Sequence, residues 1–151
     1  MKNRLILIIF ILFLTGCERK PLLDKLSGSK VTETITITEW GKWIPTHIIV
    51  KKDQTFTVTV TGKIIASDFF NHSWTLNPSG IPRGPSEGNN PFVQNVYTGV
   101  LVGKIGLTTP YILGASYTGI SLSDGVLELG INNSDLCTLT SGSYTITITA
   151  E

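Results

Sequence analysis

Four oxygen-bearing side chains stand side by side in the last third of the chain: Asn132, Asn133, Ser134 and Asp135. They follow directly on an apolar run, 126–131, that has the length of a β-strand. Amide and carboxylate oxygens are ligands for calcium in proteins, and they also accept hydrogen bonds from hydroxyl groups. The cluster therefore predicts a strand end suited to a ligand or an ion. The alternative is a polar turn whose Asn and Ser side chains cap the strand.

Catalytic chemistry finds little support in the side chains that would have to carry it. A hydrolase of the Ser-His-Asp type needs a histidine base. His47 lies in an apolar run and is expected to be a core or edge residue, and His72 lies beside Ser73 without a nucleophile-elbow glycine motif. Glycoside hydrolysis needs two paired carboxylates. The candidate acids are scattered singly: Glu87, Asp124, Glu128 and Asp135. We therefore expect that the chain is not an enzyme.

The N-terminus has the pattern of a bacterial lipoprotein signal. A charged start is followed by an unbroken apolar run, 5–14, and then by Thr-Gly before Cys17. A transmembrane anchor is the alternative, but the run is well short of the roughly 20 residues that span a bilayer. Residues 1–16 are therefore predicted to be a signal peptide and Cys17 to be lipid-modified. The protein would then be exported and lipid-anchored in the cell envelope, in the outer membrane by the usual rule for Glu18.

The charge balance argues against nucleic acid as a partner. The full chain has 12 Lys and Arg residues and 11 Asp and Glu residues. Removing Lys2 and Arg4 with the signal leaves 10 basic against 11 acidic residues, a net charge of −1. Such a balance gives no electrostatic reason to expect nucleic acid or an anionic membrane surface as partner. Membrane attachment is expected through the N-terminal lipid.

Cysteine usage leaves no internal disulfide under this interpretation. The chain has two cysteines, Cys17 and Cys137. If the sulfur of Cys17 carries a lipid, Cys137 has no partner within the chain. A lone cysteine among apolar neighbours is typically buried and inert, which is what we expect of Cys137.

Threonine alternating with large apolar residues dominates the chain after residue 30. β-Branched residues fit a pleated strand, and a polar face opposite an apolar face is typical of antiparallel sheets in a sandwich. No segment after the signal has a convincing helical period. We predict an all-β fold, a single antiparallel β-sandwich (jelly roll) over 31–151, joined to the lipid by a tether over 17–30. The predicted strands are 31–39, 44–50, 55–61, 96–105, 126–131 and 144–149.

One long segment, 68–95, is predicted to be irregular. It carries four of the seven prolines together with several glycines. Loops of this length in compact domains are usually functional or disordered. Two tryptophans earlier in the chain, Trp40 and Trp43, flank Gly41. Trp43 is expected to plug the core at the open end of a sandwich, whereas Trp40 is left open between the core and a surface platform for sugar rings.

Several short motifs in a fixed order resemble one known family. They are Gly-x-Leu-x-Gly-Lys-Ile-Gly from Gly99, Pro-aromatic-x-apolar-Gly from Pro110, Gly-x-Leu-x-Leu-Gly-x-Asn from Gly125, and Ser-Gly-Ser-Tyr-Thr-Ile-Thr-Ile from Ser141. Together they resemble the PA-IL-like family of bacterial calcium-dependent galactose-binding lectins, from roughly Trp43 to the C-terminus. The resemblance implies a jelly-roll fold and calcium-assisted binding of galactose-type sugars.

Residue by residue, the resemblance implies a calcium site after the 126–131 run. It assigns the backbone carbonyl of Ala66 and the side chains of Asn132 and Asn133 to the ion. The chain departs from the family at Asn133, where the family has an acidic residue, and Asp135 is the nearest acid that would replace it. The predicted metal ligands are therefore Ala66, Asn132, Asn133 and Asp135.

The resemblance also implies that the segment 68–95 lies over the sugar. The family's loop supplies a His and a nearby Asp to the sugar, and the residues around Asn90 offer neither here. Small-ligand sites combine a few converging polar groups with an apolar lining. The function expected is carbohydrate binding by a surface-anchored lipoprotein. The alternative is a structural or protein-interaction domain that has kept the sandwich and lost the sugar and metal site. The predicted ligand-binding residues are Trp74, Asn90, Asn132, Asn133 and Asp135.

Overall fold

The computed structural model describes residues 30–80, 92–133 and 137–151. Every regular element in these ranges is a β-strand. No helix among the described residues is long and apolar enough to cross a membrane. The predicted signal peptide, Cys17 and nearly all of the predicted tether lie outside the described residues.

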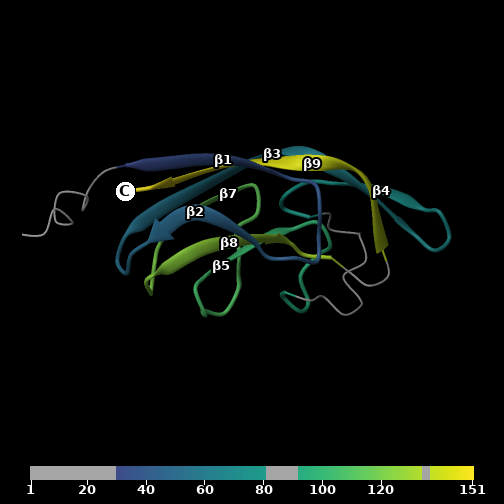
Figure 1. Ribbon diagram of the computed structural model, residues 1–151. Helices are drawn as coiled ribbons and strands as arrows, with labels where there is room; N and C mark the ends of the chain where they lie inside the picture. Colours follow the sequence, from purple (N-terminus) through teal and green to yellow (C-terminus); the bar gives the residue numbers. More distant parts are fainter. Residues whose placement is uncertain (1–29, 81–91, 134–136) are drawn as a thin grey trace, which may run out of the picture.

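The strands form two antiparallel sheets that face each other (Figure 1). Sheet A contains β1 (Val31–Ile37), β9 (Cys137–Ala150), β3 (Thr55–Asp68) and β4 (Ser73–Leu76) in that order, with β7 (Ser116–Ile120) also paired to β3. Sheet B contains β2 (Ile44–Val50), β8 (Gly125–Ile131), β5 (Leu101–Ile105) and β6 (Tyr111–Ile112) in that order. The predicted all-β antiparallel sandwich is confirmed.

Alternation along β3 and β9 builds one wall of the core. Phe56, Val58 and Val60 in β3 are buried between the sheets, and β9 pairs along β3 and buries Ile146 and Ile148 in the same way. Burying one such side chain stabilises the fold by about 1.5–3 kcal/mol. The largest fully buried side chains come from both sheets: Tyr144, Phe56, Ile37, Ile48, Ile64, Leu76, Leu101, Leu127, Leu129, Ile131, Ile146 and Ile148.

Two glycines let β3 and β9 continue beyond the strands predicted from the sequence. The predicted strands, 55–61 and 144–149, stop where Gly62 and Gly142 interrupt the alternation. Both glycines have positive φ, 106° and 95°, and a Cβ on either would collide with a carbonyl oxygen of the facing strand. Glycine tolerates this conformation, so the two strands stay paired through the bend and each spans 14 residues.

The segment 68–95 is regular in part, because β4 forms within it and pairs with the far half of β3. The short strands β6 and β7 were not expected from the alternation either. The predicted strand 96–105 begins only at Leu101, since the residues before it make a turn in which Val100 N–H bonds to the carbonyl of Tyr97 at 3.4 Å. Strands as short as β4, β6 and β7 carry too little period to be recognised in sequence.

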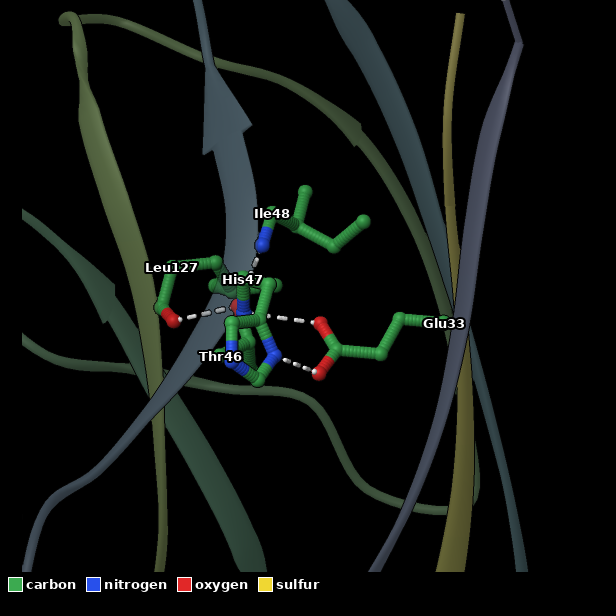
Figure 2. A network of polar contacts seen from close by, with 5 residues as sticks. All are labelled: Glu33, Thr46, His47, Ile48 and Leu127. Atoms are coloured by element: carbon green, nitrogen blue, oxygen red, sulfur yellow. Dashed lines mark hydrogen bonds and ion pairs between the residues drawn. The ribbon is translucent and has the colours of Figure 1, made fainter.

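One side of the sandwich is closed by a polar link between the edge strands β1 and β2 (Figure 2). Glu33 in β1 accepts a hydrogen bond from the backbone N–H of His47 at 2.8 Å, and its other oxygen lies 2.8 Å from His47 Nδ1. The side chain of His47 is 97% exposed and that of Glu33 is 16% exposed. His47 is therefore an edge residue, and the core position considered for it is excluded.

Figure 2 also shows the hydrogen bonds of Thr46, which lies at a register shift in β2. The register of β2 on β8 shifts between Pro45 and Ile49. Within the shift, Thr46 donates its hydroxyl to the carbonyl of Leu127 at 2.8 Å and accepts the N–H of Ile48 at 3.1 Å. The Thr46 hydroxyl thus satisfies backbone groups that the interrupted ladder would leave unpaired.

The sandwich has two ends that are built from different connections. At the β2–β3 end, backbone hydrogen bonds join the turns 51–54 and 121–124. The described domain also begins and finishes here, because Val31 pairs with Ala150 (left in Figure 1). At the β3–β4 end, β8 finishes and the hairpin turn 69–72 connects β3 to β4 (right in Figure 1).

Candidate functional site

The predicted site residues that the structure describes are all placed at the β3–β4 end. Ala66 pairs with Trp74 of β4 on one side and with Leu139 of β9 on the other, next to a register shift in β3. Asn132 and Asn133 directly follow the last residue of β8. Asn90 and Asp135 lie outside the described residues. Their predicted roles stay predictions.

Asn132 is fully buried and its amide is bonded within the chain. Its Oδ1 accepts the N–H of Val93 at 3.2 Å, and its Nδ2 donates to the carbonyls of Val93 and Val96 at 3.2 and 3.0 Å. Its backbone carbonyl accepts the N–H of Gly99 at 2.7 Å, and its backbone N–H donates to the carbonyl of Val100 at 2.9 Å. Asn132 therefore ties the segment before β5 to the end of β8, which gives it a positioning role.

Asn133 has the opposite character, although it is the next residue. Its Oδ1 is buried and has no hydrogen-bond partner among the described residues. Gly41, with φ of +70°, passes beside it, and a Cβ at Gly41 would lie 3.6 Å from this oxygen. A buried acceptor without a donor costs about 1–3 kcal/mol, so Asn133 Oδ1 calls for a donor or a cation beyond the described residues.

Trp74 lies half-buried at the same end. Because its register partner Ala66 is a core residue, the indole faces the interior and packs against the core. The ring of His72 approaches it edge-on, with centroids 6.3 Å apart. Trp74 is thus placed beneath the turn of the β3–β4 hairpin, and its predicted contact with a sugar ring stays a prediction.

Asp68 closes the β3–β4 hairpin, a role that the sequence does not reveal. Its carboxylate accepts the N–H groups of Phe70 and His72, each at 2.9 Å, and lies 3.0 Å from His72 Nδ1. Desolvation raises the pKa of Asp68, but the hydrogen bonds from His72 and Phe70 outweigh it and hold the pKa below its ordinary value. The Asp68 and His72 pair is therefore engaged in forming the turn.

The oxygen atoms at this end can be compared with the ligands that calcium needs. Calcium takes six to eight oxygen ligands, several of them charged. Asn133 Oδ1 is an oxygen of the right kind and has no partner within the described ranges, whereas the only carboxylate assigned to the predicted site, Asp135, lies outside them. Within the described ranges, no three His, Cys, Asp or Glu side chains are grouped as a metal site would require. Of the two predicted amide ligands, Asn132 Oδ1 already accepts the N–H of Val93, which leaves Asn133 Oδ1 as the side-chain oxygen suited to an ion in the described ranges.

Of the two earlier tryptophans, the sequence leaves Trp40 open between core and surface and predicts Trp43 in the core. Trp40 packs against the core. The ring of Trp43 instead packs against Phe92, with centroids 4.2 Å apart and planes tilted by 42°, and Phe92 lies over Gly130 on the outer face of sheet B. Lys104 Nζ lies 4.8 Å from the centroid of the Trp43 ring, a cation–π distance. Trp43 therefore covers the outside of the sheet, contrary to its expected core position.

A cleft of about 640 Å³ opens at the β2–β3 end, on the side opposite the Glu33 link. Three rings, those of Phe56, Tyr111 and Tyr117, form its aromatic part, with centroids 5.4 to 6.3 Å apart. Gly119 leaves room for Tyr117 to lie along the strand, since a Cβ there would collide with the phenol ring. The other lining residues are Ile105, Leu107, Thr108, Thr109, Pro110, Ile120, Ser121, Leu122 and Ser123.

Two hydroxyl groups in the wall of this cleft have no partner in the described part of the chain. They are Tyr111 Oη and Ser123 Oγ, both buried. Burial, and to a smaller extent the neighbouring Tyr117, raises the pKa of the Tyr111 phenol, so it keeps its proton at neutral pH and can donate it. The sequence does not single out this cleft, because its residues come from β3, β5, β6, β7 and two turns.

Comparison with family models and with curated proteins finds no match. Among solved structures, the chain is similar to one described as "EclA N-terminal domain; PllA-like lectin". The TM-score is 0.52 at 17% sequence identity, and the match covers 78% of this chain and 95% of that one. The chain shares the fold of that lectin domain. Membership of the PA-IL-like family stays a prediction from the motifs.

Proposed function

We propose that this chain is a carbohydrate-binding, lectin-like protein whose sugar site lies at the β3–β4 end. The observation that carries the proposal is the fold shared with a domain described as a PllA-like lectin, over 95% of that domain. The buried Oδ1 of Asn133 supports the choice of this end, because it has no partner among the described residues and a sugar hydroxyl would be a suitable donor to it.

Recognition would combine few polar contacts with an apolar lining. Asn133 Oδ1 accepts a sugar hydroxyl, Asn132 holds the neighbouring segment in place, and Trp74 offers part of its ring to the apolar face of the sugar. A single neutral hydrogen bond contributes about 1 kcal/mol net, so the carboxylate of Asp135 is assigned the stronger, charge-assisted contact.

The finer form of the proposal is a galactose-type, calcium-assisted site. It rests on the motif resemblance and on the suitability of amide and carboxylate oxygens for calcium. Asn133 and Asp135 are the residues that would hold the ion. No contact described above depends on it.

The proposal includes lipid anchoring at Cys17, which rests on the charged start, the short apolar run and the Thr-Gly-Cys sequence that ends it. Substituting Cys17→Ala should leave the protein out of the membrane fraction, or unprocessed at the larger size. Membrane fractionation at an unchanged processed size would contradict anchoring at this residue.

The second candidate, a protein-interaction domain, is favoured by one specific observation. The turn of the β3–β4 hairpin presents two neighbouring phenylalanines, Phe69 and Phe70, that are 80% and 81% exposed. Exposed apolar side chains at a loop tip are typical of contact sites between proteins.

A glycan array separates the two candidates. The chain from residue 18 onward, which retains every strand, is applied with calcium and again with chelator, and the affinity of a bound galactoside is then measured by calorimetry. Asn133→Ala should weaken binding about fivefold, as the loss of about 1 kcal/mol implies. Asn71→Gly, which removes an exposed amide at a residue with φ of 64°, should leave the affinity unchanged. No glycan bound in either condition would contradict the lectin proposal and leave the interaction domain.

A further inference from the structure

The β2–β3 end carries an apolar rim around the cleft. Leu107 and Leu122 lie in two separate turns and have relative exposures of 104% and 85%, and Ile120 beside them is 61% exposed. All three line the same cleft. Leucines held this far out of the core in two neighbouring turns are not explained by packing within the domain.

The chain also joins the domain at this end. Val31 pairs with Ala150, and Ala150 pairs with Phe56, which lies in the floor of the cleft. The 13 residues from Glu18 to Lys30 reach at most about 47 Å, so a lipid on Cys17 holds this end of the domain within that distance of the membrane. This step rests on the anchoring part of the proposed function.

We propose that the leucine rim, defined as Leu107, Ile120 and Leu122, enters the surface of the lipid bilayer and that the cleft receives the acyl-ester region of a bilayer lipid. The β3–β4 end, with Asn133 and Trp74, then faces away from the membrane. The partner is therefore a lipid surface, and its contact is apolar.

The chemistry of the cleft suits an ester-linked chain. Phe56, Tyr117 and Pro110 offer an apolar wall to hydrocarbon. The Tyr111 phenol and the Ser123 hydroxyl have no partner within the described ranges, and ester oxygens are acceptors for both. Charge at this end is balanced. Lys30 lies 2.8 Å from Glu151, Lys51 lies 3.8 Å from Asp124, and the same turn carries one further cation and one further anion, Lys52 and Asp53. We therefore expect the contact to depend little on anionic lipid.

The experiment is vesicle co-sedimentation of the chain from residue 18 onward, which carries no lipid. Vesicles of phosphatidylethanolamine with a low or a high fraction of phosphatidylglycerol are used at low and high salt. Because burial of one leucine changes partitioning by about tenfold, Leu107→Ser and Leu122→Ser should each weaken binding by that factor. Tyr111→Phe should weaken it severalfold. Phe70→Ser, an equally exposed apolar residue at the other end, should leave it unchanged.

Other results would overturn the proposal. They are no vesicle binding by the parent chain, an equal loss in Phe70→Ser, and binding that follows anionic lipid and salt instead of the leucines. A dimer in solution that Leu107→Ser dissociates, with vesicle binding intact, would assign the rim to a second copy. Unchanged binding in Tyr111→Phe would overturn the ester contact. Glycan binding should survive the leucine changes, and vesicle binding should survive Asn133→Ala, so the two proposals fail separately.

Discussion

Asn132 and Asn133 are chemically identical neighbours whose amides do different work. The amide of Asn132 donates to the carbonyls of Val93 and Val96. The side-chain oxygen of Asn133 is buried beside Gly41 without a partner in the described ranges. The Asn-Asn pair at a strand end is visible in the sequence, and it predicts a polar site there. The sequence does not show which of the two amides is hydrogen-bonded within the chain, because that depends on where the residues before β5 lie.

Asn133→Asp should show opposite effects with and without calcium. In chelator, the change buries a carboxylate without a partner and should destabilise the domain by about 1–3 kcal/mol or more. With calcium, a charged ligand should strengthen the site, and an ion that binds only the folded state adds up to about 2.7 kcal/mol at a hundredfold excess over its dissociation constant. The measurement is the melting temperature of the chain from residue 18 with calcium or chelator.

Asn132→Asp is the matched control for this prediction. A carboxylate cannot donate to the carbonyls of Val93 and Val96, so the variant should be destabilised in both conditions. A calcium-dependent rescue of Asn132→Asp but not of Asn133→Asp would place the ion at the wrong residue for our proposal.

At the scale of elements, the alternating pattern predicts the position of the long strands better than their extent. The runs 55–61 and 144–149 are recognised because threonine and apolar residues alternate, which is a local property of the chain. Their continuation depends on Gly62 and Gly142 facing the opposite strand, which is a property of the pair. The sequence does not predict β4 for a related reason. This strand is held by its pairing to β3 and by the hydrogen bond from His72 to the Asp68 carboxylate.

The β3–β4 hairpin should loosen in acid through Asp68. Because hydrogen bonds hold the pKa of Asp68 below its ordinary value, the carboxylate stabilises the hairpin fully above the unfolded pKa of about 4. That contribution is lost as the pH falls through the lowered pKa of the folded state. Amide exchange of Phe70 and His72, followed by NMR between neutral pH and pH 2, should show protection disappearing over this window.

Asp68→Asn tests the assignment. The amide cannot form the charge-assisted bonds, so protection of the two N–H groups should be lower at neutral pH and should no longer change in acid. Acid-dependent exchange that persists in Asp68→Asn would show that another group controls the hairpin.

At the scale of the whole molecule, the sandwich is asymmetric. Glu33 and His47 join the sheets along one side, whereas the cleft lies between them on the other. The sequence predicts the sandwich because the long strands each show the alternating period. It does not predict the cleft or the leucine rim, because their residues are brought together only by the pairing of β7 with β3 and of β6 with β5.

The asymmetry also predicts how the molecule stands on a membrane. Trp40 and Trp43 flank Gly41, which lies beside Asn133, and Trp74 pairs with Ala66, so the tryptophans belong to the β3–β4 end. Vesicles whose acyl chains carry bromine quench tryptophan fluorescence at close range. They should leave the native fluorescence unchanged and should quench an added tryptophan in Leu107→Trp.

Phe70→Trp is the matched control, since Phe70 is as exposed as Leu122 but lies in the turn of the β3–β4 hairpin. Its fluorescence should not be quenched, because this turn would stand on the far side of the domain from the bilayer. Quenching of Phe70→Trp without quenching of Leu107→Trp would invert the orientation and put the sugar-binding end on the membrane. In that case the tether, which joins the domain at Val31, would have to run past the whole sandwich to the lipid. Its 13 residues reach at most about 47 Å, and a rise of about 3.4 Å per residue makes the 14-residue strand β9 about 48 Å long, so such a path has no slack.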